Sequence, residues 1–310
     1  MEKMAASWPA RLKELWAGEI EWNSSMAGRC TLRTGGPAMA LVAPAGRQEL
    51  VDLLIVLQGI RAPWRVVGRG SNILVPDSGY AGVVIVLGGK LSDLTRLPGR
   101  NGEGVRVRAE AGCGLMRLVS WCADQGLSGL EFAAGIPGSV GGAVVMNAGA
   151  WGSEIADRLD SLTLLAPSGE LLTRVRAELA VFYRCIDTGG MIVVEAEFLL
   201  KKEEPRAIAD RGRELLARRR ARQPRGVASA GSFFKNPPGM PAAGRLIEEA
   251  GLKGTRIGGA EVSPVHANFL VNTGGATARD FFDLMLFVQE AVQKRFGVWL
   301  EPEVHILPQA

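Results

Sequence analysis

Cysteine is scarce in this sequence of 310 residues, and the four that occur, Cys30, Cys113, Cys122 and Cys185, lie far apart. No pair has the close spacing of a metal-ligand motif, and disulfide frameworks are typical of much shorter secreted chains. We therefore expect reduced cysteines, no metal site and a cytoplasmic protein.

Histidine is scarcer still, since His266 and His305 are the only two. Neither stands in an arrangement typical of a metal centre or a catalytic triad. A core or surface position is the simpler interpretation of both.

Long apolar runs are also missing. No stretch reaches the roughly 18 apolar residues that would cross a membrane, and residues 1–22 lack the apolar centre of a signal peptide. Trp8, Leu12, Leu15 and Trp16 follow helical spacing, which predicts an amphipathic helix docked on the protein rather than on a membrane.

Charge of one sign is only slightly in excess, with 36 Lys and Arg against 32 Asp and Glu. A net charge of +4 suits anionic small molecules but is too weak by itself to indicate nucleic acid. Arginines cluster between Arg211 and Arg225 without the interleaved aromatic residues that would stack on bases. We interpret this stretch as a solvated helix face, some of whose arginines could meet a diphosphate.

The length exceeds that of one ordinary core and predicts two or three domains. Residues 38–200 alternate short apolar runs with glycine turns, which indicates an α+β region. Strands are expected at residues 65–67, 83–87, 105–109, 162–165 and 191–200, and helices at 48–59 and 115–125.

The pattern changes at Lys201. Charged helical spacing covers residues 203–222, and further helices are expected at 242–250 and 277–296. Thr277 and Asp280 have the spacing of a capping box, and Gly297 would end that helix. A final strand is expected at 298–307, on which Glu301, Glu303 and His305 would share one face.

Glycine, in contrast, is abundant, with 40 residues that partly gather in two blocks. In the first, Gly68, Arg69, Gly70, Ser71 and Asn72 directly follow an apolar strand. Glycines allow consecutive N–H groups to point into one concavity that binds phosphate. A plain glycine turn is the alternative.

The second block leaves very little side-chain bulk, which favours close approach to a flat or polyanionic cofactor. A tight turn between strands would need fewer glycines, and neither block has the GxGxxG spacing of a dinucleotide-binding unit. The candidate cofactor-binding residues of this block are Gly135, Ile136, Pro137, Gly138, Ser139, Gly141, Gly142 and Ala143.

Six blocks of the sequence, in order, resemble the UDP-N-acetylenolpyruvoylglucosamine reductase family. They are GRGSN (68–72), GLEFAAGIPGSVGG (129–142), MNAGA (146–150), YR (183–184), AGSFFKNP (230–237) and LEPEV (300–304). The resemblance implies an α+β, FAD-binding fold of the vanillyl-alcohol-oxidase type followed by a smaller α+β substrate-binding domain. It also implies that FAD takes hydride from NADPH and reduces UDP-N-acetylglucosamine enolpyruvate to UDP-N-acetylmuramate for peptidoglycan synthesis.

The resemblance assigns three catalytic roles by position. Arg184 would stabilise the substrate carboxylate, Ser232 would give a proton to C2, and Glu303 would assist Arg184. A surface arginine, a turn hydroxyl and an exposed edge carboxylate are the ordinary alternatives. Tyr183, Lys235 and Asn236 would contact the substrate.

Two features qualify the resemblance. Cys185, Ile186 and Asp187 follow Arg184, where the family usually has a serine two positions beyond the arginine. The short connection from Arg184 to Ser232 resembles the subclass that lacks an inserted substrate-covering loop, so no tyrosine of such a loop is assigned.

The domains implied are residues 1–202 for FAD, 203–300 for substrate, and 301–310 as a strand and tail returning toward the FAD region. Because the first histidine is His266, histidyl attachment in the FAD region is excluded and FAD would be held non-covalently. We expect a monomer without nucleic-acid or membrane partners. Another FAD-dependent oxidoreductase of the same fold and a basic nucleic-acid-binding protein are the alternatives.

Overall fold

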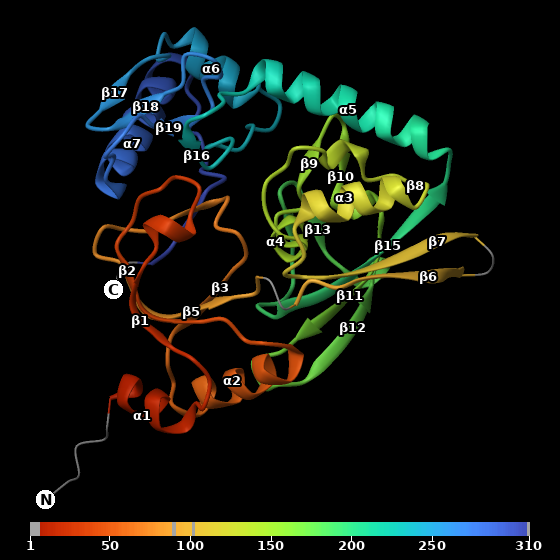
Figure 1. Ribbon diagram of the computed structural model, residues 1–310. Coiled ribbons are helices and arrows are strands. Elements are labelled where there is room, and N and C mark those ends of the chain that lie inside the picture. The colour runs from red at the N-terminus through yellow and green to blue at the C-terminus, as the bar shows by residue number, and fades with distance from the viewer. Residues whose placement is uncertain (1–6, 89–90, 101–102, 309–310) are drawn as a thin grey trace, which may run out of the picture. The chain divides into compact units, whose positions relative to one another are not determined.

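The computed structural model describes residues 7–88, 91–100 and 103–308. The chain divides into two compact units, each assembled from three separate stretches. The first unit comprises Met1–Trp22, Ala40–Arg69 and Gly82–Ala217, and the second comprises Asn23–Met39, Gly70–Ala81 and Arg218–Ala310. Both units combine helices with strands, in agreement with the α+β class expected from the sequence (Figure 1).

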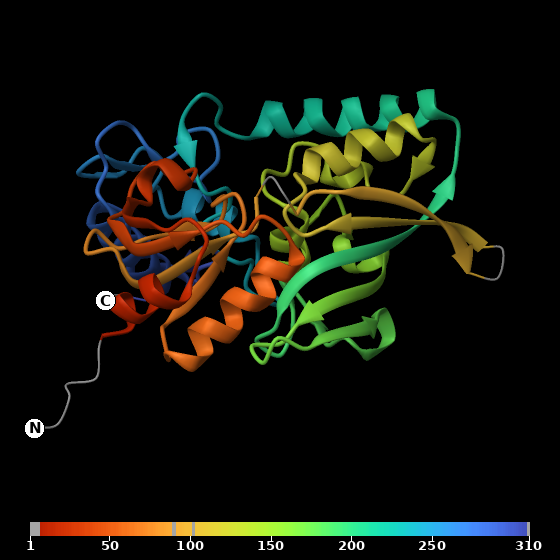
Figure 2. The same cartoon turned by 60° about the horizontal axis from the view of Figure 1, so that its bottom comes forward.

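The first unit is built on an antiparallel sheet in the order β12-β11-β15-β7-β6, with β8 paired to one end of β15. Figure 2 shows β6 and β7 running side by side as a hairpin next to β15. The strands are β6 (Leu94–Arg100), β7 (Glu103–Glu110), β8 (Leu127–Ser128), β11 (Leu159–Leu165), β12 (Leu171–Val175) and β15 (Ile192–Lys202).

One face of this sheet carries charged residues that are paired across strands. Glu197 of β15 accepts hydrogen bonds from Arg106, at 2.7 Å, and from Arg108, at 2.8 and 3.0 Å. Glu195 lies two residues earlier and pairs with Arg47 at 2.6 Å. Both glutamates are buried residues, so their partners are needed to offset the loss of hydration.

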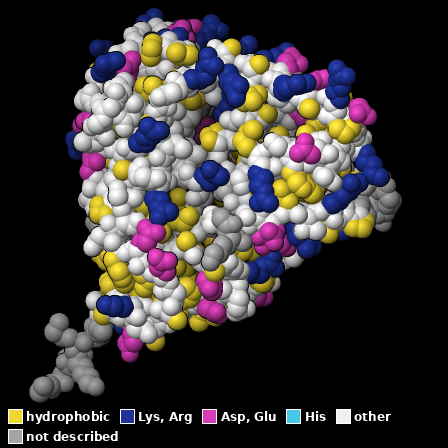
Figure 3. All heavy atoms as spheres, in the orientation of Figure 1, with side chains coloured by type: hydrophobic (Ala, Val, Ile, Leu, Met, Phe, Trp, Pro, Cys, Tyr) yellow, Lys and Arg dark blue, Asp and Glu magenta, His cyan; other side chains and the backbone are white. Residues whose placement is uncertain are grey.

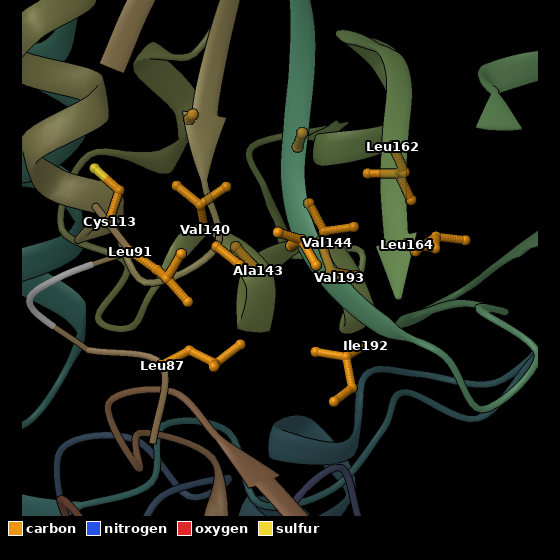
Figure 4. Close-up of a cluster of buried hydrophobic side chains, with 14 of the residues drawn as sticks. Leu87, Leu91, Cys113, Val140, Ala143, Val144, Leu162, Leu164, Ile192 and Val193 are labelled. Carbon is orange, nitrogen blue, oxygen red and sulfur yellow. The ribbon is translucent and has the colours of Figure 1, made fainter. Parts of the chain in front are cut away.

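The opposite face is apolar, because side chains alternate along a strand. It packs against α3 (Leu115–Asp124) and α4 (Val140–Val145). Buried side chains of α4 gather with those of β11 and β15 in the core shown in Figure 4, among them Val140, Ala143, Val144, Leu162, Leu164 and Val193. This packing fixes α4, which belongs to the second glycine block.

A four-stranded sheet has the order β1-β2-β5-β3, in which β3 and β5 are parallel. Its strands are β1 (Glu21–Ser25), β2 (Pro37–Val42), β3 (Trp64–Val67) and β5 (Tyr80–Val86). Helices α1 (Trp8–Leu15) and α2 (Arg47–Gly59) pack on each other. Two short hairpins complete the first unit: β9 (Gly149–Ala150) with β10 (Ser153–Glu154), and β13 (Val181–Phe182) with β14 (Cys185–Ile186).

The second unit has a sheet in the order β16-β19-β18-β17, against which α7 packs (Figure 1). The elements of this unit are β16 (Ala228–Ser229), β17 (Arg256–Ile257), β18 (Ala260–Val262), β19 (Leu270–Asn272), α6 (Ala243–Glu249) and α7 (Ala278–Phe296). A short parallel pair joins β4 (Ile73–Leu74) to β20 (His305–Ile306). The remaining long helix, α5 (Pro205–Arg222), runs from the first unit into the second.

The boundaries of α7 confirm the sequence prediction in detail. The Thr277 and Asp280 side chains form the reciprocal capping box, and Gly297 ends the helix with φ of 73°. Its buried positions include Phe281, Leu284, Val288 and Val292, which follow helical spacing. Within the described residues, no helix is both long and apolar enough to cross a membrane.

The prediction of one strand over residues 298–307 was wrong, since only β20 (His305–Ile306) is a strand there. The chain pairs first with one neighbour and then with another. The Lys235 N–H donates to the Glu301 carbonyl at 2.9 Å, whereas the His305 N–H donates to the Asn72 carbonyl at 3.0 Å. The change of partner interrupts the regular alternation, so a shared strand face of Glu301, Glu303 and His305 does not follow.

The start of α7 yields a prediction about stability. Asp77 accepts hydrogen bonds at 2.8 Å from the N–H groups of both Ala278 and Arg279, in the first turn of the helix. Because a carboxylate stabilises a helix N-terminus, Asp77→Ala should lower the free energy of unfolding by ~0.5–2 kcal/mol in a urea titration. Asp124→Ala, at the last residue of α3, is the matched control and should change it by less than ~0.5 kcal/mol. Equal losses would contradict the capping role of Asp77.

Candidate active site

The start of the first glycine block meets the second block inside the first unit. Gly68 directly follows β3, and a side chain there would collide with the Ser139 hydroxyl. Ser139 caps α4, and Gly114, the N-cap of α3, forms a β-bridge to it. The start of the first block therefore lies against the second block, beside the beginnings of two helices.

Glycines within the blocks serve different purposes. A Cβ on Gly141 would lie 2.8 Å from the Ala111 Cβ, and one on Gly70 would collide with the Arg29 carbonyl. Packing within the protein is therefore sufficient to explain both. Gly142 is exposed, and among the described residues outside its own helix only the Ser139 hydroxyl, at 3.5 Å, would lie within 4 Å of a Cβ placed there. Of these three glycines, Gly142 is thus the one whose surroundings are open to a ligand.

The segment before the second block is fixed by an ion pair. Glu131, a buried residue, accepts a hydrogen bond from Arg211 of α5 at 2.7 Å and another from the Gly129 N–H at 2.7 Å. Burial by itself would raise the pKa of Glu131, but these hydrogen bonds outweigh it and lower the pKa below the ordinary value. The carboxylate therefore stays charged and holds the turn that leads to Gly135.

Arg184 occupies a strained position in the hairpin between β13 and β14. Its φ is 59°, in the left-handed region that arginine rarely adopts. Its guanidinium donates to the Gly149 carbonyl at 3.1 Å and lies 5.2 Å from the centre of the Tyr183 ring. Strain of this kind is kept where surrounding contacts impose it, and it marks positions worth testing for function.

A residue that the sequence did not single out supports this hairpin. Asn147 is fully buried, with φ of 39°. Its side chain donates to the Phe182 carbonyl at 3.2 Å and accepts from the Ala156 N–H at 3.1 Å. Asn147 belongs to the MNAGA block, but only the backbone angle and burial distinguish it as a support of the Arg184 turn.

Ser232 and Glu303 lie on paired segments of the second unit. The Glu303 N–H donates at 2.8 Å to the carbonyl of Phe233, the residue that follows Ser232. Asn72 donates from its side chain to the Glu303 carbonyl at 3.0 Å. Glu303 is therefore bonded directly to Asn72, the last residue of the first glycine block, and to Phe233, the residue next to Ser232.

The remaining sequence candidates have identifiable partners in the same unit. Lys235 lies 3.5 Å from Glu301, whose side chain is 73% exposed. The Asn236 side chain accepts from the Ala243 N–H at 3.0 Å, at the start of α6. Tyr183 and Arg184 belong to the first unit, whereas Ser232, Lys235, Asn236 and Glu303 belong to the second. No cluster of potential metal ligands occurs among the residues that the structure describes.

Comparisons with known proteins cover nearly the whole chain. Residues 38–174 match an FAD binding domain, and residues 223–307 match the C-terminal domain of UDP-N-acetylenolpyruvoylglucosamine reductase. Together with the mixed helices and strands, these matches confirm the expected fold class, in which an FAD-binding fold is followed by a smaller domain.

Reductases of this name from several bacteria are similar over almost their full length. That of Geobacter sulfurreducens is 45% identical over 96% of this chain and 97% of its own, and that of Bacillus licheniformis is 41% identical over 96% of both. The crystal structure of UDP-N-acetylenolpyruvylglucosamine reductase from Thermus caldophilus superposes with a TM-score of 0.78 at 39% identity, covering 94% of this chain and 98% of the other. The chain therefore belongs to the family of UDP-N-acetylenolpyruvoylglucosamine reductases, which are FAD-binding oxidoreductases.

Proposed function

We propose that this protein uses FAD and NADPH to reduce UDP-N-acetylglucosamine enolpyruvate to UDP-N-acetylmuramate, a precursor of peptidoglycan, in the cytoplasm. The observation that carries the proposal is the direct pairing of the segments that bear Ser232 and Glu303. These residues are far apart in the sequence and have adjoining roles in the reaction inferred from the family.

The residues of the two glycine blocks fit an FAD held without a covalent bond. A side chain at Gly68 would collide with the Ser139 hydroxyl unless one of them shifted, while Gly142 is exposed and open. The first histidine of the chain is His266, outside both blocks. Bound there, FAD would supply the hydride chemistry that links NADPH to C3 of the enolpyruvyl group.

Addition at C3 places negative charge on C2 and the carboxylate of the substrate. A fixed cation beside that carboxylate would stabilise this charge. Arg184 is suited to the role, because its left-handed backbone and its bond to Gly149 restrict where the guanidinium lies. Glu303 would assist Arg184 in polarising the substrate, while Tyr183, Lys235 and Asn236 contact its sugar or phosphates.

A proton must then reach C2 to give the lactyl ether. Ser232 would donate it from its hydroxyl and recover a proton from solvent, which balances the hydride delivered at C3. The pairing of Phe233 with Glu303 and Asn268 supports this assignment, since a proton donor must be held at a constant distance from the carbon it protonates.

The proposal extends to the domains, the oligomeric state and the partners of the protein. Residues 1–202 would form the FAD region, 203–300 the substrate domain, and 301–310 a returning tail, in a monomer. Nucleic-acid binding through α5 is not favoured, because Arg211 is paired with Glu203 and Glu131, and Arg213 with Asp210. In Figure 3, dark blue and magenta side chains are interspersed along the stretch where Figure 1 draws α5.

A test of the overall function follows the visible absorption of the purified protein without oxygen. NADPH should bleach the flavin band, and the enolpyruvyl nucleotide should restore it with formation of UDP-N-acetylmuramate, identified by mass. A colourless protein, or a flavin that the nucleotide does not reoxidise, would contradict the proposal. Reduction of the flavin by an alcohol or a sugar in place of NADPH would favour a different oxidoreductase of this fold.

Ser232→Ala should separate the two half-reactions. Flavin reduction by NADPH should stay within about twofold of normal, whereas reoxidation by the substrate should slow by ~10²–10⁴, the usual contribution of a positioned general acid. Stopped-flow absorbance measures both rates. Ser232→Cys should recover part of the second rate, and in D₂O the native enzyme should place deuterium at C2. Normal turnover by Ser232→Ala would leave Ser232 as a turn residue only.

Arg184→Gly should abolish turnover while leaving stability almost unchanged. Glycine adopts φ of 59° without strain, which offsets the lost hydrogen bond to Gly149, so the free energy of unfolding should change by less than ~1 kcal/mol. Reoxidation by the substrate should slow by at least ~10², as for loss of one donor to a developing oxyanion. The matched control is Arg61→Gly, since exposed Arg61 has φ of 54°; it should keep full activity. An active Arg184→Gly protein would remove Arg184 from the mechanism.

A further inference from the structure

The short segment from Ser232 to Lys235 is irregular, yet its backbone is bonded on both sides. On one side lie residues 301–303: the Glu303 N–H donates to the Phe233 carbonyl at 2.8 Å, and the Lys235 N–H donates to the Glu301 carbonyl at 2.9 Å. On the other side, the part of the chain that the structure describes pairs no strand with it, and Asn268 makes the bonds.

Asn268 makes three hydrogen bonds to two consecutive residues. Its carbonyl accepts from the Phe233 N–H at 2.7 Å. Its side-chain oxygen accepts from the Phe234 N–H at 2.9 Å, and its side-chain nitrogen donates to the Phe234 carbonyl at 2.8 Å. The amide group thus presents the donor and the acceptor that a neighbouring strand would supply.

Asn268 is itself held firmly in place. It is only 4% exposed, and its N–H donates to Nδ1 of His266 at 3.2 Å. The His266 ring packs edge-on against Phe269, with centroids 4.9 Å apart. Burial, aided by the nearby Lys253 charge, lowers the pKa of His266, so the ring is neutral near pH 7 and Nδ1 is able to accept.

The bonds of Asn268 fall on the residues that connect the two catalytic candidates. Phe233 directly follows Ser232, and its carbonyl is the acceptor for the Glu303 N–H. Phe233 and Phe234 are fully or almost fully buried, so a shift of their backbone would move Ser232 and Glu303 together. Other bonds of the segment come from residues 301 and 303 themselves and would shift with it.

We propose that Asn268 is a positioning residue that fixes Ser232 and Glu303 at their working separation from the substrate. The proposal rests on the function given above and adds a buried residue for which that function requires no contact with substrate or cofactor. Its side-chain amide makes the two bonds that a neighbouring strand would make to Phe234. The segment is therefore held in place although no strand of the described chain pairs with it on the side of Asn268. Misplacement of a reacting group by about 1 Å is enough to cost ~10² in rate.

The test is Asn268→Asp, which keeps the shape and the acceptor but replaces the donor to the Phe234 carbonyl with an oxygen. Measured at pH 8, reoxidation of the reduced flavin by the enolpyruvyl nucleotide should slow by ~10–10². FAD content, flavin reduction by NADPH and the substrate dissociation constant should stay within about threefold of the wild type, because those steps do not need Ser232.

The matched control is Asn272→Asp in the same unit. The Asn272 side chain donates to the Leu32 carbonyl at 2.9 Å and accepts from the Gly274 N–H at 2.9 Å, so the chemical change is the same. We expect both variants to lose stability, but only Asn268→Asp to slow reoxidation by more than threefold. If both slow it equally, Asn268 has only a structural role and the proposal fails.

A second readout asks whether Asn268 acts through Ser232. In the Ser232→Ala background, Asn268→Asp should cost at least threefold less than it does alone, because residues that act together are not additive. Losses that simply multiply would overturn the proposal. Should Asn268→Asp fail to fold, Asn268→Ser removes the amide without burying a charge and is judged by the same criteria.

The outcomes also separate this inference from the proposed function. If the wild-type enzyme is not reoxidised by the enolpyruvyl nucleotide, the proposed function fails. If the wild type is reoxidised and Asn268→Asp matches it within threefold, the function stands and the role of Asn268 is refuted.

Discussion

Buried peptide groups need hydrogen-bond partners, and this requirement shapes three irregular segments that carry candidate site residues. In each of them an asparagine side chain supplies bonds to the backbone. Asn147 serves the turn before Arg184, Asn268 serves the residues after Ser232, and Asn72 binds the Glu303 carbonyl. An amide has a donor and an acceptor on one planar group, so it replaces a peptide bond of a missing neighbour.

Close approach between backbone segments is the second constraint, and it accounts for several of the glycines. Gly68 faces the Ser139 hydroxyl, Gly70 faces the Arg29 carbonyl, and Gly141 faces Ala111. Glycine density therefore does not by itself identify the residues that meet a cofactor. Some glycines let the chain pack on itself, and a neighbour such as Gly142 remains open to a ligand as a result.

Elements with strong local signals were predictable from the sequence. The helix α7 begins at its capping box and ends at a left-handed glycine, since both signals act within one helical turn. The strand expected over residues 298–307 was not, because the chain changes hydrogen-bonding partner near Glu303. Period-two alternation is meaningful only while a strand keeps one neighbour, so the proposed face of Glu301, Glu303 and His305 could not be derived locally.

The sequence by itself determined the family, most of the helices and the identity of the candidate residues, because motif spacing and helix signals are written in adjacent positions. Tertiary structure decided which backbone atoms hold those residues. Arg184 has a strained φ, Asn147 is buried, and Asn268 makes three bonds to Phe233 and Phe234. In each case the side chain bonds to a segment that is distant along the chain. Such bonds depend on which groups are left unpaired once the chain has folded, and no local pattern of residues specifies that.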